Sequence, residues 1–117
     1  MAVDAHCRVI ESRESGYPDP LIVSQGCEVS VGERDAAWPA FRWCATAGGK
    51  QGWVPEDYLE LRGASGVLRR AYSANELAVA VNDELQILDE VGGWYWCENA
   101  FGERGWVPAL NVRLVRR

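Results

Sequence analysis

The feature that most constrains this chain is an internal repeat. The motif Gly52-Trp53-Val54-Pro55 returns 53 residues later as Gly105-Trp106-Val107-Pro108, and Trp43-Cys44 returns at the same offset as Trp96-Cys97. Two copies of so long a period are too few for a solenoid, in which neighbouring repeats complete one another's cores. We therefore predict that each copy forms a small domain of its own.

A second match sets the boundaries of the two copies. Residues 27–31 parallel residues 83–87 at an offset of 56, so the first copy carries three extra residues. We place them in the polar loop 32–40. The predicted organisation is a first domain over residues 5–61, a link over 62–66 and a second domain over 67–115.

The local pattern in each copy is that of short β-strands. Residues 28–31 and 84–87 alternate polar and apolar side chains, as a strand with one buried face must. Glycine-containing segments follow Trp43 in the first copy and Trp96 in the second, and both indicate β-hairpins. No stretch shows a sustained helical period, so we predict an all-β chain.

Composition and charge limit the classes of partner. The 117 residues are 48% apolar and 25% charged, with no apolar run near the roughly 20 residues that a membrane helix needs. The net charge of -5 disfavours nucleic acid, whose binding proteins carry basic surfaces. We therefore predict no nucleic-acid and no membrane partner. The first residues lack the basic start and apolar core of a secretory signal, so we expect a cytoplasmic protein.

The sequence offers little material for catalysis. Its four cysteines form no C-x-x-C pair, and its one histidine, His6, lies near the start of the chain. We expect free thiols, although four cysteines also allow three disulfide pairings. Without a phosphate-cradling glycine loop or a nucleophile beside a base, we predict no catalytic residue, no metal and no cofactor.

Five motifs follow one another in the second copy. They are Val67-Leu68-Arg69-Arg70-Ala71-Tyr72, Glu76-Leu77-Ala78-Val79, Asn82-Asp83-Glu84-Leu85, Gly93-Trp94-Tyr95-Trp96-Cys97 and Gly105-Trp106-Val107-Pro108. This order resembles the SH3 family, specifically the bacterial proteins that carry tandem copies of an SH3-like barrel. The resemblance implies two small five-stranded SH3-like barrels. It also implies a shallow groove of tyrosine, tryptophan and proline side chains that takes extended peptides, beside an acidic loop that pairs with a basic peptide residue.

The resemblance assigns candidate ligand-binding residues in both copies. In the second copy it implies Tyr72, Glu76, Trp94 and Pro108, with the ring of Trp94 exposed at the groove, while Asn111 stands where the family places its last groove tyrosine. In the first copy, Phe41 takes the place of the groove tryptophan. The other candidates there are the last-strand residues Pro55 and Tyr58, the loop ring Tyr17, the loop acids Glu14 and Asp19, and Trp38 in the inserted loop.

These features favour a non-catalytic module that binds a protein or peptide, with an extended, Pro- or Arg-containing segment as its ligand. One alternative is a structural scaffold in which the two barrels pack together without a free groove. Another is the recognition of cell-wall peptide or glycan, which the resemblance to bacterial SH3-like domains suggests. The sequence leaves both alternatives open.

Overall fold

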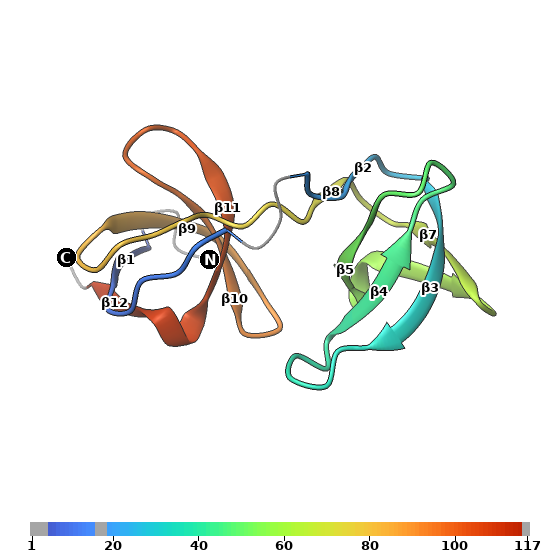
Figure 1. The fold of residues 1–117 in the computed structure, drawn as a ribbon, viewed down its shortest axis with the longest axis horizontal. Helices are drawn as coiled ribbons and strands as arrows, with labels where there is room; N and C mark the ends of the chain where they lie inside the picture. Colours follow the sequence, from blue (N-terminus) through green and yellow to red (C-terminus); the bar gives the residue numbers. More distant parts are fainter. Residues whose placement is uncertain (1–4, 16–18, 116–117) are drawn as a thin grey trace. The chain divides into compact units, whose positions relative to one another are not determined.

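A computed structural model of the chain describes residues 5–15 and 19–115. These residues form strands and two short 3-10 turns, which confirms the predicted all-β class, and no helix among them is long and apolar enough to cross a membrane. The chain divides into two compact units (Figure 1). Unit 1 contains the described residues of 1–18 and 75–117, and unit 2 contains residues 19–74.

Unit 1 is built on a five-stranded sheet with the strand order β11-β10-β9-β1-β12. All of its strand pairs are antiparallel. A 3-10 turn, η2 (Ala109–Asn111), precedes the last strand. The strands are β1 (His6–Val9), β9 (Glu84–Val91), β10 (Trp94–Glu98), β11 (Arg104–Pro108) and β12 (Val112–Val115).

Unit 2 repeats this arrangement with the order β5-β4-β3-β7-β6. It adds a two-stranded sheet of β2 (Ile22–Val23) and β8 (Tyr72–Ser73), and its 3-10 turn is η1 (Glu56–Tyr58). The strands of the larger sheet are β3 (Glu28–Arg34), β4 (Phe41–Ala45), β5 (Gln51–Pro55), β6 (Leu59–Arg62) and β7 (Ser65–Leu68).

The two sequence copies exchange their first strands. Strand β1, from the first copy, pairs with β9 and β12 of the second copy, and in Figure 1 it is the blue strand beside the red β12. Strand β7 lies where the second copy begins, and it pairs with β3 and β6 of the first copy. Each unit therefore combines segments of both copies, and we call this arrangement the strand exchange.

The strand exchange divides the chain into compact units that differ from the predicted contiguous ranges. The compact units are not the contiguous ranges 5–61 and 67–115, and residues 62–66 are not a link between barrels. They contain the end of β6, a two-residue turn and the start of β7, with Arg62 opposite Ser65. Gly63 has a φ of +63°, which a tight turn between two hairpin strands requires. So short a turn holds β7 against β6, because a strand joined by two residues folds back on the strand before it.

Alternation along the strands builds a core inside each unit. In unit 1, Cys7 and Val9 of β1 point inward with Leu85 and Ile87 of β9. Cys97 belongs to the same cluster, and its counterpart Cys44 is likewise buried in unit 2. All four cysteines are free thiols. The buried ones act as small apolar side chains inside the sheets.

Candidate functional site

The backbone of each unit offers equivalent positions for a binding site. In unit 2 the amide of Arg69 donates to the carbonyl of Tyr58 at 2.7 Å, and in unit 1 the amide of Ile10 donates to the carbonyl of Asn111 at 2.8 Å. Tyr72 pairs with Val23 in unit 2 in the way that Arg13 pairs with Val79 in unit 1. Tyr72 therefore corresponds to Arg13, and Tyr58 corresponds to Asn111.

In unit 2 these positions carry rings, and we call Phe41, Pro55, Tyr58 and Tyr72 the ring cluster. Phe41 lies opposite Pro55 on neighbouring strands. The rings of Tyr58 and Tyr72 meet edge to face, with centroids 5.5 Å apart. The Tyr72 hydroxyl donates to the carbonyl of Trp53 at 2.8 Å, which fixes the ring. The cluster thus combines three residues of the first copy with one of the second.

The ring cluster is packed rather than open. Phe41, Tyr58 and Tyr72 are 5%, 8% and 6% exposed, and Pro55 is fully buried. The guanidinium of Arg70 lies 4.5 Å from the ring centroid of Tyr58. This cation covers a face that a ligand could otherwise use. Access to the face of Tyr58 therefore requires Arg70 to move.

The same positions in unit 1 have different chemistry. Trp94 lies opposite Pro108, and its ring is only 8% exposed, so the prediction that Trp94 is exposed was wrong. The central carbon of the Arg13 guanidinium lies 5.1 Å from the centroid of the Trp94 ring. Asn111 is buried, and its side-chain amide donates to the carbonyl of Glu11 at 3.1 Å. Unit 1 therefore presents a cation and an amide where unit 2 presents two tyrosines.

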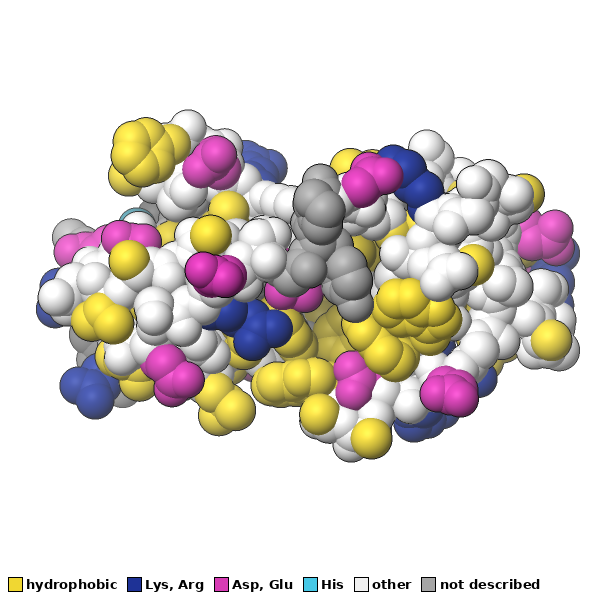
Figure 2. All heavy atoms as spheres, viewed as in Figure 1, with side chains coloured by type: hydrophobic (Ala, Val, Ile, Leu, Met, Phe, Trp, Pro, Cys, Tyr) yellow, Lys and Arg dark blue, Asp and Glu magenta, His cyan; other side chains and the backbone are white. Residues whose placement is uncertain are grey.

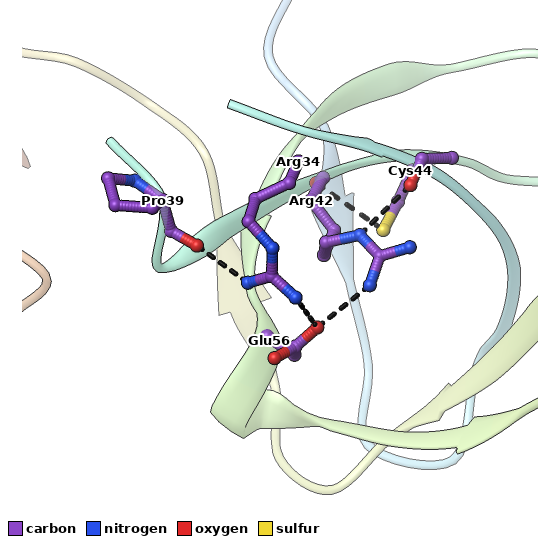
Figure 3. Close-up of polar contacts among 6 residues, drawn as sticks. Arg34, Pro39, Arg42, Cys44 and Glu56 are labelled. Carbon is purple, nitrogen blue, oxygen red and sulfur yellow. Dashed lines mark hydrogen bonds and ion pairs between the residues drawn. The ribbon is translucent and has the colours of Figure 1, made fainter. Parts of the chain in front are cut away.

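An ion-pair network fixes the loop that follows β3 in unit 2. One carboxylate oxygen of Glu56 accepts hydrogen bonds from Arg42 and Arg34, each at 2.8 Å (Figure 3). Arg34 also donates to the carbonyl of Pro39 at 2.7 Å. The hydrogen bonds from Arg42 and then from Arg34 lower the pKa of Glu56. The network ties the loop to the turn that carries Tyr58.

Burial determines the protonation state of the Cys44 thiol, which lies beside this network. Cys44 is fully buried, and its Sγ lies 3.6 Å from the Arg42 carbonyl, to which it donates (Figure 3). Burial raises its pKa from 9.0 to about 11, against a smaller lowering by the charge of Arg42. Cys44 is therefore a protonated packing residue at neutral pH rather than a nucleophile.

The same loop holds Trp38 in a defined place. The Asp35 carboxylate accepts from the amides of Ala37 at 2.9 Å and Trp38 at 3.3 Å, forming a local side-chain turn. The amide of Phe41 donates to the carbonyl of Trp38 at 3.0 Å. Trp38 is half-buried and directly connected to the backbone of the ring cluster.

The predicted acidic loop is divided between the units. Glu14 is exposed in unit 1, whereas Asp19 belongs to unit 2 and pairs with Lys50 at 3.0 Å. Glu76 lies in unit 1, 3.5 Å from the guanidinium of Arg13. Tyr17 lies outside the described residues. The predicted acids Glu14 and Asp19 of the first copy therefore belong to different units.

Sequence reasoning missed Arg13 and Arg70, whose guanidinium groups lie over the rings of Trp94 and Tyr58. Arg70 belongs to the first motif of the second copy, residues 67–72, but the sequence of that motif does not indicate that Arg70 faces Tyr58. Arg13 becomes a site residue only when β1 belongs to the second copy's sheet. The signal that could have revealed this pairing is the two-residue turn at residues 63–64.

The charged side chains are otherwise dispersed. Acidic and basic groups are scattered over the face of each unit drawn in Figure 2. Within residues 5–15 and 19–115, no group of three or more His, Cys, Asp or Glu side chains could hold a metal ion.

Comparison with known proteins supports the tandem arrangement. The family model described as variant SH3 domain matches twice, over residues 6–62 and 69–115. No curated protein and no solved structure gives a significant match. The two matches cover most of the chain and confirm the tandem SH3-like resemblance found in its motifs. The chain belongs to the variant SH3 domain family.

Proposed function

We propose that this chain binds an extended peptide segment of a partner protein at the ring cluster of unit 2. SH3-like domains are generally protein-interaction modules. The observation that carries the proposal is the assembly of Tyr72 from one copy beside Tyr58 of the other, with centroids 5.5 Å apart. The strand exchange thereby gathers tyrosine, proline and phenylalanine side chains in unit 2.

Rigid rings suit the recognition of an extended peptide. A polyproline II segment has no internal hydrogen bonds and presents apolar side chains that pack against aromatic surfaces. Tyr72 loses little freedom on binding, because its hydroxyl is already held by the Trp53 carbonyl. Displacing Arg70 from Tyr58 costs about 0.5–1 kcal/mol if the contact has the strength of an exposed cation–π pair. That cost is small beside the free energy that a peptide would gain by burying apolar side chains against the rings.

Trp38 and Asp57 lie close in the chain to residues of the ring cluster. Trp38 sits in the loop fixed by Arg34, Glu56 and Arg42, and that loop leads into Phe41. Asp57 is an exposed carboxylate next to Tyr58 in η1. A ligand with a basic residue beside its apolar segment would satisfy both features, and the net charge of -5 favours such a partner.

The low exposure of the rings favours a second candidate, a structural scaffold. Rings that are only 5–8% exposed are as typical of core packing as of a binding surface. In the scaffold the ring cluster contributes stability alone. The two candidates differ in whether a soluble peptide can displace the contacts that cover these rings.

An NMR titration of the full chain with proline-rich, arginine-containing peptides separates the two. The test variant is Tyr58→Asn, which copies the residue that unit 1 carries at the same position. The control is Leu110→Ala, which removes an exposed side chain from the corresponding turn of unit 1. We expect peptide-induced shifts in wild type and the control, and at least tenfold weaker binding in Tyr58→Asn with its fold retained. Unmoved spectra in wild type, or full binding by Tyr58→Asn, would contradict the proposal.

A further inference from the structure

The hairpin between β10 and β11 carries a phenylalanine that its own unit leaves open to solvent. Phe101 is 87% exposed, more than any other large apolar side chain that the structure describes. Its loop is nonetheless well ordered, because the side-chain oxygen of Asn99 accepts hydrogen bonds from the amides of Phe101 at 2.9 Å and Glu103 at 3.0 Å. Gly102 completes the turn with a φ of +81°. We call Phe101 and Glu103 the hairpin tip.

The hairpin tip combines an apolar ring with a negative charge. The carboxylate of Glu103 accepts a hydrogen bond from Nδ2 of Asn99 at 2.9 Å, which holds the charge close to the turn. Unit 2 has Gly48 and Lys50 at the equivalent positions, so it offers neither the ring nor the acid. An aromatic side chain on a preorganised turn loses little conformational entropy on binding and is typical of an interface anchor.

A pocket on the β1–β12 side of the same unit has the complementary chemistry. Its volume is about 240 Å³, and it is lined by two cations and three apolar side chains, Arg8, Arg113, Ile10, Leu114 and Val115. Ile10 and Leu114 are 47% and 58% exposed. Pockets for drug-sized ligands measure about 300–1,000 Å³, so this one suits a single large side chain. We call it the edge pocket.

The two cations of the edge pocket face each other. Arg8 and Arg113 are direct partners in the β1–β12 pair, where like charges are destabilising. Arg8 reaches Glu84 at 3.4 Å, and Arg113 forms no ion pair with any other residue in the described part of the chain. A carboxylate that enters between the two guanidinium groups would relieve their repulsion. Unit 2 has Val67 and Glu60 at the equivalent positions and lacks this pair of cations.

Charge distinguishes the edge pocket from two other hollows of the described surface. The hollow beside η1 in unit 2 is lined by Glu56 and Asp57, and one in unit 1 is lined by Glu14 and Asp83, each pair with a single arginine. These acids would repel the carboxylate of the hairpin tip, whereas the charged residues of the edge pocket are both cations. The edge pocket is therefore the better match for the tip.

We propose that the hairpin tip of one copy of this chain docks into the edge pocket of a second copy. The ring of Phe101 packs among the apolar side chains of the pocket, and Glu103 pairs with its arginines. Strands β11 and β12 lie at the two ends of the strand order, and in Figure 1 the orange loop of the hairpin projects away from β12. The tip therefore docks on another copy rather than on its own unit. Because each copy has one tip and one pocket, the contact is head to tail and extends into short chains of copies.

The first test is the concentration dependence of the NMR spectrum of the full chain. One side chain and one ion pair offset little of the free energy lost on association, so we expect a dissociation constant on the order of 1 mM. The amide signals of Ile10, Leu114 and Phe101 should move together as the wild-type chain is concentrated. Phe101→Ala should weaken association at least tenfold, because it removes the buried ring. Leu110→Ala removes another exposed side chain of unit 1 and should behave as wild type.

Mixing two defective variants identifies both halves of the contact. Phe101→Ala keeps the pocket, while Arg113→Glu, which copies Glu60 of unit 2, keeps the tip and loses a cation of the pocket. Each variant alone should associate at least tenfold more weakly than wild type. When unlabelled Arg113→Glu is added to isotope-labelled Phe101→Ala, the signals of Ile10 and Leu114 should shift as they do in wild type. Addition of the double variant instead should leave them unmoved.

Three results would overturn the proposal. They are wild-type signals that do not change with concentration, self-association of Phe101→Ala equal to that of wild type, and a mixture of the two variants without shifts at the pocket. If Arg113→Glu fails to fold, Arg113→Gln removes the charge alone and takes its place in the same comparison. All these variants keep Tyr58 and Tyr72, so the outcome is independent of peptide binding at the ring cluster.

Discussion

Units 1 and 2 share a strand order but differ at the positions where a ligand would bind. Unit 2 has Tyr72 and Tyr58 in edge-to-face contact, whereas unit 1 has Arg13 and Asn111 at the same backbone positions. The difference depends on the strand exchange, because Arg13 and Tyr72 each come from the other copy's opening segment. A duplicated domain can therefore acquire two distinct surfaces without a change of fold.

The units also differ in how the chain assembles them. Unit 2 is one continuous segment, residues 19–74, in which β6 and β7 form a hairpin with a two-residue turn. Unit 1 needs β1 to insert between β9 and β12, which lie far along the chain. A strand that arrives from so far away carries a larger entropy of loop closure than a hairpin partner.

The largest effect is expected from truncating the exchanged strands. Leu68→Ala removes a buried side chain from β7 and should destabilise unit 2 by about 2–5 kcal/mol. Val9→Ala, at the equivalent position of β1, should destabilise unit 1 by a smaller amount. Urea unfolding followed by the indole signals of Trp53 and Trp106 separates the units. Loss of the Trp106 signal in Leu68→Ala with Trp53 unaffected would contradict the strand exchange.

Two equivalent glycines give the next effect. A Cβ added at Gly105 would lie 2.8 Å from the backbone nitrogen of Leu77, whereas one at Gly52 would lie 3.0 Å from the Cβ of Leu21. We expect Gly105→Ala to cost about 1–3 kcal/mol, because the nearest crowded atom belongs to the backbone, and Gly52→Ala to cost less. Thermal unfolding of the two variants measures the difference. If Gly52→Ala lowers the melting temperature more than Gly105→Ala does, the packing around Gly105 in unit 1 is not the tighter of the two.

Alkaline pH should destabilise unit 2 through Cys44. Its pKa is raised by burial from 9.0 to about 11, so the unfolded chain loses this proton first. The stabilising contribution is present below pH 9 and is lost as the pH rises through 11, by up to about 3 kcal/mol. Cys44→Ala should flatten this decline in unit 2. An unchanged pH slope in Cys44→Ala would contradict this assignment.

The smallest effect is expected from Glu56→Ala, which gives unit 2 the residue that unit 1 has at this position, Ala109. The loss releases Arg34 and Arg42 from a partly exposed carboxylate, so the unfolding midpoint should fall slightly and by less at high salt. The indole signal of Trp38 should shift, since the loop is no longer tied to η1. A Trp38 signal identical to that of wild type would show that Asp35 alone holds the loop.

The sequence predicted the class of fold and the small residues of the core, because these depend on patterns within one copy. Alternation placed residues 84–87 in a strand, and the Trp-Cys repeat placed Cys44 and Cys97 at equivalent buried positions. The choice of partner for β1 and β7 could not be predicted in the same way, because both copies offer nearly the same edge strands. The turn at Gly63 decides it, and this residue pattern was read as a link.

For the candidate site, too, the sequence predicted what depends on one copy and not what depends on pairing between the copies. Residue types such as Pro55, Tyr58 and Tyr72 could be named from the motif order, but their association in one unit could not, since it requires the strand exchange. The burial of Trp94 was also missed. Alternation shows which face of a strand a ring lies on, but not whether a guanidinium such as that of Arg13 covers it.

The central claim is the strand exchange, and engineered disulfides test it most directly. Arg8 lies opposite Arg113 in the β1–β12 pair, and facing residues of an antiparallel pair have the Cα separation that a disulfide needs. If the barrels were contiguous, Arg8 would instead face Glu60, the residue equivalent to Arg113. In a Cys27→Ser background, mild oxidation followed by peptide mass mapping should link the cysteines of Arg8→Cys/Arg113→Cys and leave those of Arg8→Cys/Glu60→Cys unlinked. The reverse pattern would contradict the strand exchange and the composite ring cluster that depends on it.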